Sequence, residues 1–295
     1  MKQSQQNFGG EWTMEKLERV RKYLVAYTTI MKDRNFRFAY IDAFAGTGYQ
    51  TRKRDDNPSE LMFPEIAEQE IQDFLDGSAR IALQVQPRFQ KYIFIEKDNN
   101  RFADLQKLKV EFPLLQDDIE LVQSDANMYL KDLCLNRNWK SHRAVLFLDP
   151  YGMEVDWDTI TAIAKTKAID LWLLFPLGVA VNRLLKRDGN IDTILRSKLD
   201  RFFGTADWYD VFYQTLPTET LFGQETVTRK ISDFKSIAQY FVERLQTVFK
   251  EGRVANNPLP LYNSRNNPLY LLCFASGNPR GAPTAVKIAQ HILRR

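Results

Sequence analysis

The sequence of 295 residues predicts an α/β fold with a doubly wound, mostly parallel sheet and helices on both faces. Two observations lead to this prediction. Short, nearly continuous apolar runs recur along the chain, and segments with apolar residues at helical spacing separate them. Strands that helices cover on both faces lose the alternating pattern of half-exposed strands, so such runs indicate a buried parallel sheet.

The expected elements follow in chain order. A first helix is predicted over 11–32, because apolar residues recur there at helical spacing. Apolar, β-branched and aromatic runs predict strands over 38–44, 92–95, 119–122, 144–148, 171–175 and 269–274. Helices between them are indicated by the apolar faces of 102–112 and 160–164, and a further helix is expected roughly over 77–86.

We expect a single domain over 1–295, with two segments outside this alternation. Residues 49–76 form a polar insertion after the first strand. Residues 186–266 form a helical and loop insertion before the last strand, with a helix starting near Ser232 and an Asn- and Pro-rich loop at its end. Such insertions often cap a substrate cleft beyond the carboxyl ends of the strands, and a purely structural extension is an equal alternative.

The composition excludes several classes of protein. Two cysteines and two histidines are too few for a disulfide framework, a Cys/His zinc site or an iron–sulfur ligand set. Free thiols and the absence of a signal-peptide pattern or a long apolar stretch predict a cytoplasmic protein without a membrane span. Residues 1–150 hold 22 basic and 23 acidic residues, and residues 151–295 hold 19 and 14. Attraction to a polyanion would come from the second half, unless this excess is only a solvated basic face.

Acidic residues stand at the ends of four successive predicted strands: Asp42, Glu96, Asp125 and Asp149. Each of them alone is more simply explained as a helix cap or a solvated turn residue. Together at one sheet edge they favour a nucleoside-type ligand. A carboxylate at Glu96 can accept both hydroxyls of a ribose, and one at Asp125 can receive an adenine amino group.

The turn after the first strand, with Asp42, Phe44, Gly46 and Gly48, resembles motif I of Rossmann-like S-adenosylmethionine (SAM) methyltransferases. Small residues there let the backbone approach a ligand closely. A dinucleotide site would favour a third glycine, which this turn lacks. The resemblance implies that Asp42 helps to hold the methionine moiety of SAM and that Glu96 binds its ribose. We expect Phe44, Gly46, Gly48 and Asp125 to complete this cofactor site.

The segment Asp149-Pro150-Tyr151-Gly152 is similar to the Asp/Asn-Pro-Pro-Tyr/Phe motif of enzymes that methylate amino groups of nucleic-acid bases. That motif implies hydrogen bonds from the amine to the Asp149 side chain and the Pro150 carbonyl, and stacking of the base on Tyr151. Here one proline is missing and the tyrosine comes one position early. A tight turn is the alternative explanation.

Over nearly its full length the chain resembles the three-Cys-motif partner (TcmP) proteins. The matching segments are Phe44–Gly48, Leu148–Gly152, Phe175–Gly178 through Asn182–Leu185, Phe202–Gly204 with Trp208, and Pro268–Tyr270 with Phe274–Ser276. The resemblance implies a Rossmann-like methyltransferase fold and association with a separate protein that bears a three-cysteine, radical-SAM-like motif. It supplies neither the reaction nor the substrate.

Asn182 and Arg183 follow the fifth strand and are candidate substrate-binding residues, since an arginine beside a turn can clamp a phosphate or carboxylate. A surface ion pair or a cap is equally compatible with Arg183. The leading hypothesis is a SAM-binding, methyltransferase-like protein that acts on nucleic acid with its three-Cys-motif partner. One alternative is a non-catalytic Rossmann adaptor for that partner. Another is a metal-dependent nuclease, for which the sequence shows no metal-ligand spacing.

Overall fold

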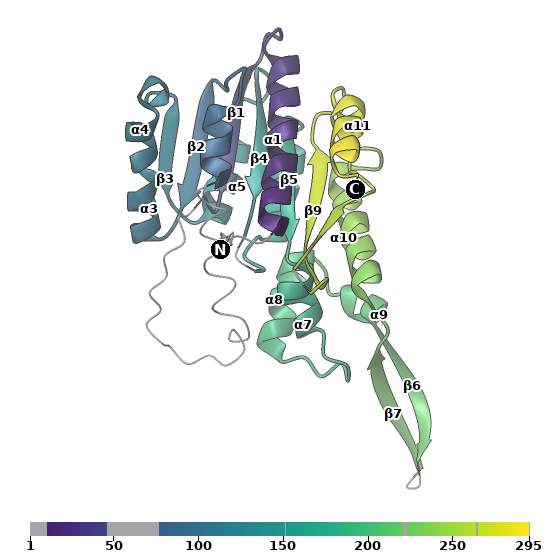
Figure 1. Ribbon diagram of the computed structural model, residues 1–295. Helices are drawn as coiled ribbons and strands as arrows, with labels where there is room; N and C mark the ends of the chain where they lie inside the picture. Colours follow the sequence, from purple (N-terminus) through teal and green to yellow (C-terminus); the bar gives the residue numbers. More distant parts are fainter. Residues whose placement is uncertain (1–10, 46–76, 151, 221–222, 264, 295) are drawn as a thin grey trace, which may run out of the picture.

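The computed structural model describes residues 11–45, 77–150, 152–220, 223–263 and 265–294 (Figure 1). Within these residues, a seven-stranded sheet has the order β3-β2-β1-β4-β5-β9-β8. Its strands are β1 (Arg37–Ala43), β2 (Lys91–Glu96), β3 (Ile119–Gln123), β4 (His142–Leu148), β5 (Ile169–Phe175), β8 (Leu259–Tyr262) and β9 (Pro268–Ser276). The first five strands pair in parallel, and β9 runs antiparallel to both β5 and β8. The predicted mostly parallel α/β fold is confirmed.

Helices cover both faces of the sheet. One face carries α1 (Glu11–Met31), the helix over 77–84, α3 (Asn99–Leu105), α4 (Lys107–Glu111) and α11 (Ala282–Ile292). The other carries α5 (Ala126–Asn136), α6 (Trp157–Lys165), α8 (Thr193–Phe203), α9 (Trp208–Phe212) and α10 (Phe234–Phe249). Because both faces are covered, β5 is buried at every position, as its continuous apolar run indicates.

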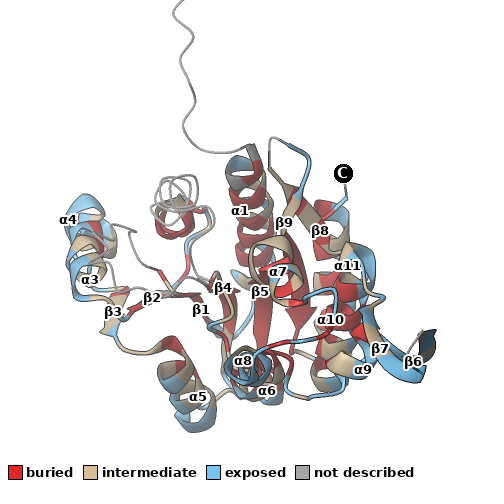
Figure 2. Cartoon of the chain, turned by 90° about the horizontal axis from the view of Figure 1, so that it is seen from below, coloured by how far each residue is buried: buried red, intermediate tan, exposed pale blue. Residues whose placement is uncertain are grey.

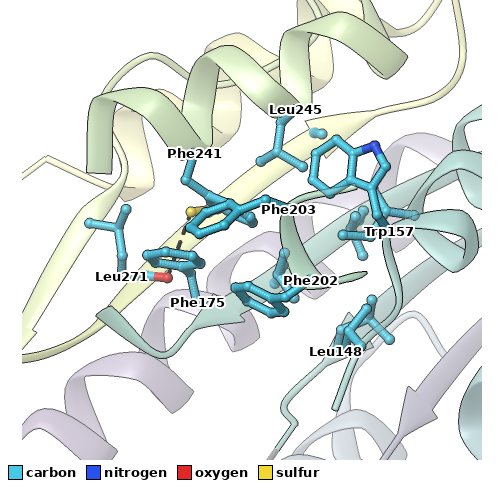
Figure 3. Close-up of a cluster of buried hydrophobic side chains, with 14 of the residues drawn as sticks. Leu148, Trp157, Phe175, Phe202, Phe203, Phe241, Leu245 and Leu271 are labelled. Atoms are coloured by element: carbon cyan, nitrogen blue, oxygen red, sulfur yellow. Dashed lines mark hydrogen bonds between the residues drawn. The ribbon is translucent and has the colours of Figure 1, made fainter. Parts of the chain in front are cut away.

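An aromatic cluster joins α8 and α10 to the end of β5 (Figure 3). The rings of Phe175 and Phe241 stack with their centroids 4.0 Å apart, and Phe202 stacks on Phe175 from the other helix at 5.6 Å. Offset aromatic stacking adds to the free energy gained from burying these rings. Segment 186–266 therefore contributes helices α8, α9 and α10 to the main core in addition to a surface extension.

The segment 186–266 also contains two features that the sequence did not predict. Strand β8 lies within the expected Asn- and Pro-rich loop and forms the edge of the main sheet. Strands β6 (Tyr213–Thr220) and β7 (Gly223–Lys230) form a separate antiparallel hairpin that projects from the body of the molecule (Figure 1).

The carboxyl ends of the parallel strands share one edge of the sheet, at the lower end in Figure 1. The short π-helical segment η3 (Leu177–Val181), α7 (Asn182–Leu184) and α8 lie at this edge, as seen from below in Figure 2. The beginning of α1 reaches the same edge, because α1 runs antiparallel to β1. Ligands of open α/β sheets bind at this position.

Candidate functional site

The strand order brings the four predicted acids to this edge in the spatial order Asp125, Glu96, Asp42, Asp149. Glu96 ends β2, Asp42 precedes the last residue of β1, and Asp149 directly follows β4. Neighbouring strands lie about 5 Å apart, so the four side chains span a short stretch of the sheet edge.

Asp42 is fully buried on the face of the sheet that α1 covers. The Tyr40 hydroxyl donates a hydrogen bond to Asp42 Oδ2 at 3.0 Å, and Oδ1 has no hydrogen-bond partner among the described residues. Burial raises the pKa of the Asp42 carboxyl to about 7, although the hydroxyls of Ser78 and Tyr40 oppose the shift. Asp42 thus offers a buried carboxylate oxygen to a ligand.

Lys16 of α1 is a member of this site that the sequence analysis missed. Its side chain is 1% exposed, and its Nζ lies 3.3 Å from Asp149 Oδ2 and 5.0 Å from the centre of the Trp12 ring. Burial lowers the pKa of Lys16 to about 8, and the negative charges of Asp149 and Asp42 limit the shift. Fully buried lysines are rare and need a compensating anion. The N-terminal helix therefore supplies a charge to the strand-end cluster.

Asp149 is 8% exposed, so Lys16 faces it from the core while a small part of it reaches the surface. Burial raises the pKa of the Asp149 carboxyl, and the Lys16 ammonium opposes that rise. Pro150 is buried directly after it. Tyr151 lies outside the described residues, so the predicted stacking role remains a prediction.

Glu96 is nearly buried and stabilises its own turn. Its Oε1 accepts backbone hydrogen bonds from Lys97 at 2.9 Å and Asp98 at 2.7 Å. Burial raises the pKa of Glu96, and these bonds and Arg101 oppose the shift. Because both bonds use Oε1, Oε2 is the oxygen that remains for the hydroxyls of a ligand.

Asp125 is the N-cap of α5, since its Oδ1 accepts the Met128 N–H at 3.1 Å. Its other oxygen lies 3.6 Å from Lys97 Nζ, and the side chain is 38% exposed. Capping of α5 is by itself a sufficient reason for an acidic residue at position 125. The exposed Oδ2 leaves the predicted adenine contact sterically possible.

Glu154, in the loop after β4, is a second group that the sequence analysis did not single out. Although the Glu154 side chain reaches the surface, desolvation raises its pKa; the charge of Arg101 opposes that rise, and the charges of Glu96 and Asp125 add to it. Asn127 fixes this loop, because it donates to the Glu154 carbonyl at 2.8 Å and accepts the Asp156 N–H at 2.9 Å. Only the loop conformation after β4 brings Glu154 to the edge.

The turn after β1 is strained at Phe44, which has a φ of 70°, a left-handed value that non-glycine residues rarely adopt. The following Ala45 N–H donates to the Ile95 carbonyl at 3.0 Å and ties this turn to β2. Such strain is found mostly at functional sites. Gly46, Gly48 and the insertion 49–76 lie outside the described residues.

The two predicted substrate-binding residues differ in their surroundings. Asn182 begins α7, and its Oδ1 accepts a 2.6 Å hydrogen bond from Lys230 Nζ at the end of β7. Asn182 therefore anchors the projecting hairpin. Arg183 is exposed and donates to the Val179 carbonyl at 3.2 Å within its own turn. No contact brings either side chain to the acidic cluster within the part of the chain that the structure describes.

Two negative observations concern the described residues alone. No group of three or more His, Cys, Asp or Glu side chains is arranged there to hold a metal ion. No helix there is both long and apolar enough to cross a membrane.

No family model matches this sequence, and neither does any curated protein. Among solved structures, a Legionella pneumophila protein is similar at 15% identity and a TM-score of 0.39, over 83% of this chain and 94% of that one. A SAM-dependent methyltransferase from Clostridium acetobutylicum is similar at 9% identity and 0.37, over 88% and 92%. A spermidine synthase is similar at 13% identity and 0.40, over 91% and 62%. Because these sequence identities and TM-scores are low, the fold assignment rests on the observed strand order and not on these similarities.

Proposed function

We propose that this chain is a SAM-dependent methyltransferase that binds SAM at the carboxyl edge of the sheet. The observation that carries the proposal is the buried Asp42 carboxylate, whose Oδ1 has no donor among the described residues. An unsatisfied buried carboxylate oxygen is costly, and a ligand that brings positive charge would relieve that cost. SAM carries a sulfonium and an ammonium group, so its methionine end fits the electrostatics of this position.

The remaining acids would hold the other parts of the cofactor. Glu96 Oε2 would accept the ribose hydroxyls, and Asp125 Oδ2 would accept the adenine amino group while its Oδ1 continues to cap α5. Phe44, Gly46 and Gly48 would form the turn against which the methionine moiety lies. Glu154, beside Glu96 and Asp125, would border the same end of the cofactor.

The residues that follow β4 would bind the molecule that accepts the methyl group. SAM, when bound, supplies an electrophilic methyl group. Asp149 would accept a hydrogen bond from the N–H or O–H of the nucleophile, which raises the electron density on the attacking atom. The Pro150 carbonyl would accept a second one from an amine, and Tyr151 would stack on a base. Lys16 would keep Asp149 ionised from the core side, as a positioning residue.

Isothermal titration of the full chain with SAM tests the cofactor. We expect one bound SAM per chain, and Asp42→Asn and Glu96→Gln to weaken binding by at least about tenfold, because each removes a charged acceptor. Glu18→Gln, an exposed acid on α1, is the matched control and should bind as the parent chain does. Absence of binding at millimolar SAM contradicts the proposal.

We further propose nucleic acid as the substrate class, in view of the cations around α7 and the base of the hairpin. Arg183, Lys186, Arg187, Arg229 and Lys230 gather there, and none forms an ion pair among the described residues. Burial and, to a smaller extent, the nearby charge of Arg187 lower the pKa of Lys230, so an anion bound beside these two cations would relieve their repulsion. Transfer of labelled methyl groups from SAM to DNA or RNA tests this step, and labelling of protein or small molecules only would exclude it.

We propose the three-Cys-motif protein as the partner, and the projecting β6–β7 hairpin as the element that contacts it. An isolated two-stranded hairpin is only marginally stable in water, and no third strand pairs with β6 or β7 among the described residues, so another chain could add to its edges. Replacing residues 214–229 by two glycines should abolish co-purification of the pair and leave SAM affinity unchanged. The adaptor alternative predicts that Asp149→Asn leaves every cellular function intact, whereas a methyltransferase should lose activity.

A further inference from the structure

A concave site lies at the edge of the sheet opposite to the strand-end acids. A cavity of about 320 Å³ opens at the amino ends of β1, β2 and β4, at the upper end in Figure 1. The strand rise of about 3.3 Å per residue puts the Ala39 floor roughly 10 Å along β1 from Asp42. Ala39 and Ile41 face the side of the sheet that α5 covers, whereas Asp42 faces α1, so the cavity is separate from the candidate cofactor site.

The cavity forms because a small residue occupies the middle of the sheet beside the last turns of α5, whose Leu133 also lines it. Ala39 of β1 is only half-buried although β2 and β4 flank it, and Ile41 and Ile93 continue the apolar floor. Trp139 forms a wall, and its indole N–H donates to the Cys134 carbonyl at 3.0 Å. That bond fixes the indole plane before any ligand binds.

The rim of the cavity carries an excess of positive charge. One carboxylate, that of Glu120, lines the cavity, and both of its oxygens already have a partner. The Tyr129 hydroxyl donates to Oε1 at 3.1 Å, and Lys91 Nζ lies 3.5 Å from Oε2. By contrast, the guanidinium groups of Arg37 and Arg137 have no ion-pair or hydrogen-bond partner among the described residues. Two free arginines above an apolar, aromatic-walled floor favour a ligand that is both flat and anionic.

We propose that this cavity binds a planar organic anion, an aromatic ring that bears a carboxylate or phosphate group. The ring lies over Ala39 and against Trp139, and the anionic group receives hydrogen bonds from Arg37 and Arg137. An arginine fork matches the geometry of both anions. This inference does not depend on the proposed methyltransferase activity.

Titration calorimetry of the full chain with 2-naphthoate tests the proposal, with 2-naphthyl phosphate to compare the two anions and 2-naphthamide as the neutral analogue. We expect one naphthoate per chain with a Kd below about 1 mM, and at least about tenfold weaker binding of the amide. Arg37→Gln with Arg137→Gln should weaken naphthoate binding about tenfold. Arg21→Gln, an exposed arginine on α1, is the control and should have no effect.

Ala39→Leu fills the floor and should abolish binding, and its thermal melting curve shows whether the variant folds. If it does not fold, the double arginine variant, whose side chains are exposed, still decides the question. Sinefungin, an analogue of SAM, should not compete with naphthoate. Competition, binding that survives loss of both arginines, or no binding at several millimolar naphthoate would overturn the proposal.

Discussion

Lys16 Nζ lies 3.3 Å from Asp149 Oδ2, and this ion pair joins the first helix to the end of the fourth strand across 133 residues of sequence. Both groups are almost completely withdrawn from water. Removing two charges from water costs several kcal/mol per ion, so the pair is retained against a desolvation penalty. Perturbed, buried charge pairs of this kind are concentrated at functional sites.

The pair predicts strongly non-additive stability changes. Lys16→Met leaves Asp149 as an uncompensated buried charge and should lower the free energy of unfolding by about 3 kcal/mol. Adding Asp149→Asn removes that charge and should restore a large part of the loss. Urea denaturation at pH 7 measures both, with Lys22→Met on the exposed side of α1 as the control. Additive effects of Lys16→Met and Asp149→Asn would show that the two groups do not interact.

Burial of Asp42 predicts a specific pH dependence of stability. Its pKa of about 7 in the folded state is higher than the value near 4 in an unfolded chain, so the native protein binds the extra proton between these values. The free energy of unfolding should therefore fall as pH rises from about 4 to about 7. Asp42→Asn cannot ionise, so its stability relative to the parent chain should increase over that interval. Thermal melting between pH 4 and pH 8 compares the two, and parallel curves would contradict the assignment to Asp42.

Asp125 offers a way to separate capping from ligand binding. Asp125→Ala should cost about 1 kcal/mol, because the Met128 N–H loses its acceptor, whereas Asp125→Ser keeps an equally good cap. Both variants lack the second carboxylate oxygen and should weaken SAM binding alike. Chemical denaturation and SAM titration of the same two proteins provide the comparison. Unchanged SAM affinity in both would leave Asp125 a helix cap only.

The strand-end acids could be predicted because each follows an apolar run, and parallel strands end at the same edge. Lys16 could not be predicted, because in a helix rich in charged residues only the packing of α1 against the sheet distinguishes a buried lysine from a solvated one. Glu154 was missed for a similar reason, since its position depends on a loop held by Asn127.

The missed strands have their own physical causes. Strand β8 has four residues and contains Pro260, which a central strand would not accept but an edge strand tolerates. The β6–β7 hairpin lacks the alternating apolar face that marks a half-buried strand, because among its described residues only the base, at Tyr213, packs on the core. Threonine pairs such as Thr215 and Thr228, whose hydroxyls lie 2.9 Å apart, stabilise it instead.

Gly204 lies directly after α8 and against the Trp157 ring of α6, and its replacement should lower the free energy of unfolding. It ends α8 with a φ of 69°, and a Cβ atom at this position would overlap with the Trp157 ring. Gly252 has a similar φ of 77° with open space around it. Both Gly→Ala changes bear the cost of a left-handed alanine, about 1 kcal/mol. Only Gly204→Ala must also displace Trp157, which adds about 1–3 kcal/mol.

Thermal and urea unfolding of the two variants measure this difference directly. Trp157 lies beside Phe241 and under the Arg244 guanidinium, 4.8 Å from the centre of its ring, so it has little room to move. Arg244 also donates to the Phe203 carbonyl at 3.0 Å, which holds the end of α8 in place. We therefore expect Gly204→Ala to alter the near-ultraviolet circular dichroism as well, whereas Gly252→Ala should not. Equal losses of stability in the two variants would mean that the α8 terminus repacks around the added methyl group without displacing the indole.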